Sequence, residues 1–155
     1  MKKQFFSFLF LLSLVVSVSA QEQASRKISE MPSLWYCDPL IMTLDTFLLE
    51  LQNNPQTNGF IIYYEGKYDN GEEKSKRKML LPRRGEADYR MQIIRNHIKF
   101  RRQNPDKIFF INGGFRDEQK TEFWIIPEGA KLPIPEPTLD ALKYRKGQPE
   151  WHCDI

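Results

Sequence analysis

The stretch that decides the fold is Gly59-Phe-Ile-Ile-Tyr-Tyr64, a continuous apolar and β-branched run. It is too short for a helix and it lacks the alternation of a half-exposed strand, which is typical of a strand buried on both faces. Two similar runs follow, Lys107-Ile-Phe-Phe-Ile111 and Thr121-Glu-Phe-Trp-Ile-Ile126. We therefore predict a sheet built from these three segments, with the first two adjacent.

Two amphipathic helices flank the first of these strands in the sequence. Asp38-Pro39 forms an N-cap and a first-turn proline, and the helix is expected to end near Asn53-Asn54-Pro55. The second helix should begin at Gly85 or Glu86 and end before Asn104-Pro105. The apolar positions recur at spacings of three and four and are Leu40, Ile41, Leu44, Phe47, Leu48 and Leu51 in the first helix, and Ala87, Met91, Ile94 and Ile98 in the second. This order predicts an α+β fold, a βαβ-type two-layer sandwich with two helices packed on a three- or four-stranded mixed sheet.

The connecting segments have their own composition. Glu65 to Arg84 has no period and is crowded with charges, so we expect a long exposed loop. Asn112-Gly113-Gly114 is typical of a turn. Four prolines between 127 and 137 favour extended geometry, which predicts that the tail, residues 128–155, lies along the surface or is mobile. A short helix is compatible with residues 138–144, and a proline-rich recognition ligand is the alternative for residues 127–137.

The first twenty residues indicate export. Lys2 and Lys3 precede an apolar run that ends at Val18-Ser19-Ala20, a cleavage site of the secretory type. We expect a signal peptide over 1–20, a flexible leader over 21–33, a periplasmic or secreted product, and no stable membrane insertion after cleavage. The alternative, an uncleaved anchor, is disfavoured because the apolar stretch is shorter than the ~20 residues that span a bilayer.

Cysteine use agrees with an oxidising compartment. The chain has two cysteines, Cys37 and Cys153, and in an exported protein these most simply form one disulfide that joins the two ends of the domain. A catalytic thiol and a metal site are the alternatives. The residues around Cys153 offer no recognisable metal-ligand spacing.

Positive charge is concentrated in one segment. The chain carries 23 basic and 20 acidic residues, and residues 67–107 alone hold 13 basic and six acidic residues. The densest group is Lys74, Lys76, Arg77, Lys78, Arg83 and Arg84. This loop could bind an anionic polymer of the envelope, or it could simply be solvated. Because the protein is exported, nucleic acid is not an expected partner.

Catalytic patterns are missing from the sequence. There is no Gly-x-Ser-x-Gly motif, and His97 lacks a partner at helical spacing, so it is expected to be a partly buried structural histidine. The adjacent carboxylates Glu72-Glu73 and Asp117-Glu118 are typical of solvated charge. We predict a non-catalytic protein without a cofactor or a metal site, and an enzyme of unknown type is the remote alternative.

The order of elements resembles a shortened and degenerate OmpA-like domain, the module that holds peptidoglycan in bacterial envelopes. The resemblance covers about residues 39–127, within a domain expected over 34–127. It rests on Leu48-Glu-Leu-Gln-Asn-Asn-Pro55, the strand 60–64 with Glu65-Gly66, the helix 87–98, the strand 108–111 with Gly113-Gly114, and the strand 121–126.

The resemblance implies a binding site for diaminopimelate in the peptide stem of peptidoglycan, or an envelope protein as partner. An aspartate after the first central strand and an arginine early in the next helix clasp the two ends of that ligand in the family. Here the matching positions are Asp69 and Arg90. The alternatives are a turn-forming aspartate and a solvated helix arginine.

A closer likeness lies in the closing region. Gly113-Gly-Phe-Arg116, Glu122-Phe-Trp-Ile-Ile-Pro127 and Gly129-Ala130 before a proline-rich end are similar to segments of secreted bacterial proteins to which no activity is assigned. This likeness implies a family of exported proteins and no particular function.

Overall fold

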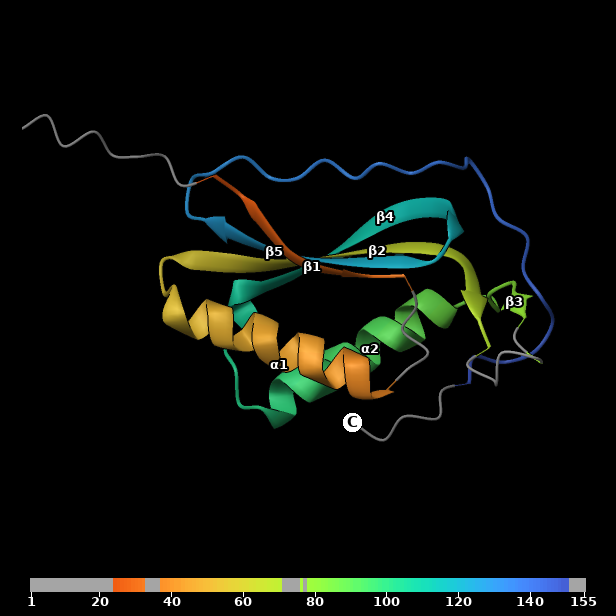
Figure 1. The fold of residues 1–155 in the computed structure, drawn as a ribbon, viewed down its shortest axis with the longest axis horizontal. Helices are drawn as coiled ribbons and strands as arrows, with labels where there is room; N and C mark the ends of the chain where they lie inside the picture. The colour runs from red at the N-terminus through yellow and green to blue at the C-terminus, as the bar shows by residue number, and fades with distance from the viewer. Residues whose placement is uncertain (1–23, 33–36, 71–75, 77, 151–155) are drawn as a thin grey trace, which may run out of the picture.

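The computed structural model describes residues 24–32, 37–70, 76 and 78–150 (Figure 1). The predicted signal peptide lies outside the described residues. The elements, in chain order, are β1 (Arg26–Met31), α1 (Cys37–Asn53), β2 (Thr57–Asp69), β3 (Met79–Leu80), α2 (Glu86–Phe100), the 3-10 turn η1 (Pro105–Lys107), β4 (Ile108–Glu118) and β5 (Lys120–Pro127).

Strand β2 lies at the centre of a mixed sheet. β4 pairs with it in parallel along one edge and β5 antiparallel along the other, so that Phe60 lies opposite both Phe109 and Trp124. β1 extends the sheet beyond β5, and β3 pairs with the far end of β2. The predicted α+β class, the mixed sheet and the adjacent pairing of the first two strands are confirmed. The described sheet has five strands rather than three or four.

Both helices cover the same face of the sheet (Figure 1). The predicted apolar stripes are the ones that face inward, and the buried members are Leu40, Leu44, Phe47 and Leu48 of α1 and Met91, Ile94 and Ile98 of α2. They pack on alternate residues of the strands, among them Ile61, Tyr63 and Phe123. This layer is the hydrophobic core of the domain.

The opposite face, which we call the outer face, is covered by the tail. From Pro127 the chain runs back across the sheet on the side away from the helices (Figure 1). The amides of Thr138 and Leu139 donate to the carbonyl of Phe115 at 2.9 and 3.1 Å, and the amide of Glu136 donates to the Tyr64 hydroxyl at 3.2 Å. The tail therefore lies along the surface, and the helix that was compatible with residues 138–144 does not form.

The outer face explains why the run 59–64 is apolar at every position. Ile62 is fully buried and Tyr64 is 1% exposed, although both point away from the helices. A strand is buried on both faces only when each face has a cover, and here the second cover is the tail. The tail thus belongs to the folded domain.

The expectation of a flexible leader over 21–33 is wrong for residues 26–31, which form β1. The register of β1 against β5 shifts between Lys27 and Ser29, as in a β-bulge. The bulge places Ile28 and Met31 on the same face despite their spacing of three, and both pack against the core. It also removes the alternation by which a strand is recognised in a sequence.

Two further expectations are corrected. The segment from Glu65 to Arg84 is not a loop throughout, because β2 continues to Asp69 with Tyr68 buried, and β3 follows. Gly113-Gly114 does not end a strand, because β4 runs through both glycines. The register shift between Tyr63 and Tyr64 marks a bulge here too, and a Cβ on Gly113 would lie 2.5 Å from the Tyr64 ring.

The link between β4 and β5 crosses β2. Only Gln119 separates the two strands, which lie on opposite edges of β2, and its amide donates to the carbonyl of Lys67 at 2.8 Å. The crossing point is Gly66, where an added Cβ would lie 2.4 Å from both the Gln119 nitrogen and the Glu118 carbonyl carbon. Only glycine leaves room for this backbone crossing.

We predict that Gly66→Ala destabilises the protein more than Gly129→Ala. The first substitution drives a methyl group into backbone atoms, and overpacking of this kind costs about 1–3 kcal/mol or more. Gly129 has a φ of 82° and nothing near its Cβ position, so its substitution carries only the left-handed penalty of ~1 kcal/mol. Urea denaturation of both variants measures the difference, and equal losses would contradict the crossing.

Candidate functional site

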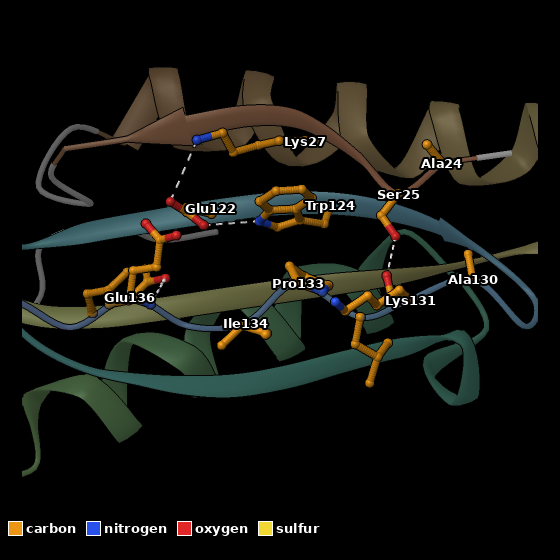
Figure 2. A pocket seen from close by; sticks show the side chains of 12 residues that line it. Ala24, Ser25, Lys27, Glu122, Trp124, Ala130, Lys131, Pro133, Ile134 and Glu136 are labelled. Carbon is orange, nitrogen blue, oxygen red and sulfur yellow. Dashed lines mark hydrogen bonds and ion pairs between the residues drawn. The ribbon is translucent and has the colours of Figure 1, made fainter.

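A groove of about 720 Å³ opens on the outer face, between the start of β1, the middle of β5 and the tail (Figure 2). Trp124 lies in the middle of it, with Pro133 of the tail facing the indole ring (Figure 2). The remaining lining residues used below are Ser25, Lys27, Glu122, Lys131, Leu132, Ile134 and Glu136. We call this the Trp124 groove.

The indole of Trp124 is fixed by its neighbours in the sheet. Trp124 lies opposite Lys27 on β1 and Phe60 on β2, and the Lys27 ammonium is 5.8 Å from the ring centroid. Its Nε1–H donates to a carboxylate oxygen of Glu122 at 3.1 Å. The ring is only partly buried, so it presents a rigid aromatic surface to the groove.

The Glu122 carboxylate is buried and charge-compensated. Its side chain is 8% exposed and lies 3.7 Å from the Lys27 ammonium and 3.6 Å from that of Lys120. Glu30 completes a group of two lysines and two glutamates, at 2.5 Å from Lys27 and 2.9 Å from Lys120. Hydrogen bonds from Lys27 and then Lys120 lower the pKa of Glu30 to about 2, so it is ionised at neutral pH.

The other wall of the groove belongs to the tail. Leu132 and Ile134 are 51% and 73% exposed, and Lys131 and Glu136 are exposed as well. The Ser25 hydroxyl donates to the carbonyl of Lys131 and so fastens the tail to the start of β1. The groove therefore offers an aromatic surface, two aliphatic side chains and exposed groups of both charges.

The arrangement suits non-covalent binding. None of the described lining residues is a histidine or a cysteine, and the Ser25 hydroxyl is engaged by a carbonyl. In the part of the chain that the structure describes, no three His, Cys, Asp or Glu side chains form a group that could hold a metal ion. A pocket of this size with a few charged groups is typical of ligand recognition.

The alternative that Arg90 is a solvated helix residue is wrong, because its side chain is buried. It is 1% exposed, its guanidinium forms an ion pair with Glu86, and it lies over the Tyr68 ring at 4.5 Å from the centroid. Asp69 is at the end of β2, where it pairs with Met79 of β3. The binding role of Asp69 and Arg90 stays a prediction.

The tail is anchored beside this buried pair. The Tyr144 hydroxyl donates to a Glu65 carboxylate oxygen at 2.5 Å, and Arg145 donates to the Tyr68 hydroxyl at 2.5 Å and to the carbonyl of Leu81 at 2.8 Å. Burial raises the pKa of the Glu65 carboxyl, although the Tyr144 hydroxyl acts in the opposite direction. Burial and the bond to Glu65 raise the pKa of Tyr144 to about 12.

The described basic residues of the predicted loop differ in their exposure and contacts. Lys76, Lys78 and Arg84 are exposed, and Arg84 lies 5.2 Å from the centroid of the Tyr144 ring. Arg83 is 13% exposed and forms an ion pair with Glu150 at 2.9 Å, so it fastens the tail. Lys74 and Arg77 lie outside the described residues, as does Cys153, and the disulfide with Cys37 therefore stays a prediction.

His97 is a structural histidine, as expected. It is 2% exposed, and its Nε2 lies 2.9 Å from a carboxylate oxygen of Asp45 on α1. Arg101 binds the same carboxylate through Nε at 2.9 Å and Nη2 at 2.5 Å. These contacts join the two helices.

Comparisons with protein-family models, with curated proteins and with solved structures found no match. The resemblance to the OmpA-like domain accordingly stays a prediction. Within the described residues, no helix combines the length and the apolar character needed to cross a bilayer.

Sequence reasoning missed the Trp124 groove. Glu122 and Trp124 are alternate residues of one predicted strand, so the sequence predicts that they lie on the same face of the sheet. The remaining wall comes from the tail, and nothing in the sequence indicates which face of the sheet the tail follows. The prolines predict only that the segment is extended. Its position depends on long-range contacts such as that between Glu136 and Tyr64.

We predict that Arg90→Ala costs about 3–5 kcal/mol of folding free energy, because it leaves the Glu86 carboxylate buried without its cation. The exposed pair of Arg26 with Glu50 is the control, and Arg26→Ala should cost no more than ~1 kcal/mol. Chemical denaturation compares them. The double variant Glu86→Gln/Arg90→Met should recover part of the loss, and a small cost for Arg90→Ala would contradict the buried pair.

Proposed function

We propose that this chain is a non-catalytic exported protein of the cell envelope, a binding module of the OmpA-like kind, whose ligand is peptidoglycan or a partner protein. The observation that carries the proposal is the Trp124 groove, a ligand-sized opening that combines an aromatic ring, two aliphatic side chains and charged groups of both signs. The predicted export signal and the order of elements support an envelope role.

Peptidoglycan is the ligand that we favour. Its peptide stems are extended and carry ammonium and carboxylate groups along an aliphatic backbone. Lys131 and Glu136 stand exposed at separate points of the tail wall, with Ile134 between them in the sequence and Trp124 across the groove. Opposite charges at separate positions can orient such a ligand, while the apolar surfaces contribute affinity.

A second candidate function is electrostatic binding of an anionic envelope polymer. The exposed cations Lys76, Lys78 and Arg84 favour it, because they form no ion pair with another described residue. Binding of this type weakens steeply with salt, as phosphate-dominated binding does. Salt dependence therefore separates it from binding in the groove.

The test is retention of the purified protein on diaminopimelate-type peptidoglycan. We expect Trp124→Ala to reduce retention about tenfold or more, as loss of an aromatic hot spot does, and Tyr89→Ala to leave it unchanged as an exposed aromatic control. Lys131→Glu and Glu136→Lys change only exposed rim charges and should also weaken retention. Circular dichroism checks that each variant is folded.

Three outcomes count against parts of the proposal. No retention of the wild type rejects peptidoglycan as the ligand. Loss of retention in Asp69→Ala together with full retention in Trp124→Ala supports the position implied by the OmpA-like resemblance and rejects the groove. Retention that disappears between 50 and ~300 mM salt and needs Lys76 and Lys78 supports the anionic-polymer alternative.

A further inference from the structure

A second opening lies between the end of α2 and the start of β4. It is a slot of about 250 Å³, and it shares no lining residue with the Trp124 groove. Its apolar lining is Ile98, Pro105, Ile108, Phe109 and Phe110. The Phe109 ring stacks on that of Phe60 at 4.9 Å between centroids and so lies on the outer face, whereas the Phe110 ring lies on the helix side with Ile98 and Ile108. The slot is therefore an apolar opening between α2 and β4, with Phe110 as its aromatic wall.

The slot has a cationic rim. Arg95 and Lys99 occupy successive turns of α2, both are exposed, and both line the opening. The guanidinium carbon of Arg95 lies 3.9 Å from the centroid of the Phe110 ring, and this contact keeps the group against the apolar wall. Neither cation forms an ion pair with another described residue.

The size of the slot limits the ligand. A cavity of ~150 Å³ holds a benzene ring, and sites for drug-sized ligands begin at ~300 Å³. A slot of about 250 Å³ therefore takes a short alkyl chain or a single aromatic ring. The rim adds two donors suited to one anion, and an arginine held in a fixed plane can bind a carboxylate through two parallel hydrogen bonds.

We propose that this slot is a binding site for a small amphiphilic carboxylate, whose alkyl or aryl body lies against Ile98 and Phe110 and whose carboxylate is bound by Arg95 and Lys99. The site is independent of the proposed function, because it uses other residues on other elements. The geometry needs no chain movement, since slot and rim are both present without a ligand.

The test uses octanoate as the probe and octanol as its neutral counterpart, with binding followed by NMR shifts of backbone amides. Octanoate should bind with a dissociation constant below ~1 mM and shift the amides of Lys99 and of 108–110. Octanol should bind about tenfold more weakly, because it cannot form the charge-assisted bonds. The variant Arg95→Gln/Lys99→Gln should lower octanoate affinity to the level of octanol.

Lys143→Gln/Lys146→Gln removes the same amount of charge from exposed positions of the tail and serves as the matched control, with unchanged octanoate binding expected. Four results would each overturn the proposal. Two concern affinity, namely equal binding of octanol and octanoate, and full octanoate affinity in the Arg95/Lys99 variant. The other two are shifts centred on Trp124 and no binding at 1 mM octanoate.

Discussion

The structure depends on the complete enclosure of β2. Its backbone is hydrogen-bonded on both edges, to β4 and to β5, and its side chains are covered on both faces. Burial of the large apolar side chains of such a strand contributes roughly 1.5–3 kcal/mol each. Enclosure of this kind needs a neighbouring strand on each edge and a cover on each face. The two helices cover only one of the two faces. The tail supplies the missing cover, and Gly66 supplies the gap through which the link between β4 and β5 passes.

The same constraint gives rise to the Trp124 groove. Pro133, Pro135 and Pro137 lack backbone N–H groups, so these residues cannot donate hydrogen bonds to a neighbouring strand. This part of the tail crosses the outer face, held at points by Glu136, Thr138 and Leu139 rather than along a continuous ladder. A cover that touches the sheet at intervals leaves space between its contacts. One such space lies over Trp124 (Figure 2).

Much of the fold could be predicted from the sequence. The continuous apolar runs 59–64 and 107–111 predict buried strands, and the spacing of apolar residues in α1 and α2 predicts which side of each helix faces inward. The predictions that failed have a common cause. They concern β1, the path of the chain at Gly113 and the extension of β2 to Asp69, and all three depend on non-local contacts. The bulges in β1 and β4 break the period of two, and Tyr68 is buried by stacking under Arg90 and Arg145 rather than among apolar side chains.

The sites were harder to predict than the fold for the same reason. A position-by-position match selected Arg90 by its place in the helix, but the fold encloses this arginine against Glu86, where it stabilises the start of α2. The Trp124 groove needs two segments that are adjacent only because the tail folds back. A charged residue in a sequence is normally predicted to be exposed. This prediction fails where a carboxylate and a guanidinium form an ion pair in the interior.

Native-state hydrogen exchange tests the central claim that the tail is a layer of the folded domain. The amides of Glu136, Thr138, Leu139 and Arg145 donate to Tyr64, Phe115 and Pro82, so they should exchange many-fold more slowly than an unstructured peptide of the same sequence. Their protection should also fall together with that of β2 when the protein is destabilised by denaturant. Exchange of these four amides at the rate of the unstructured peptide would contradict the account.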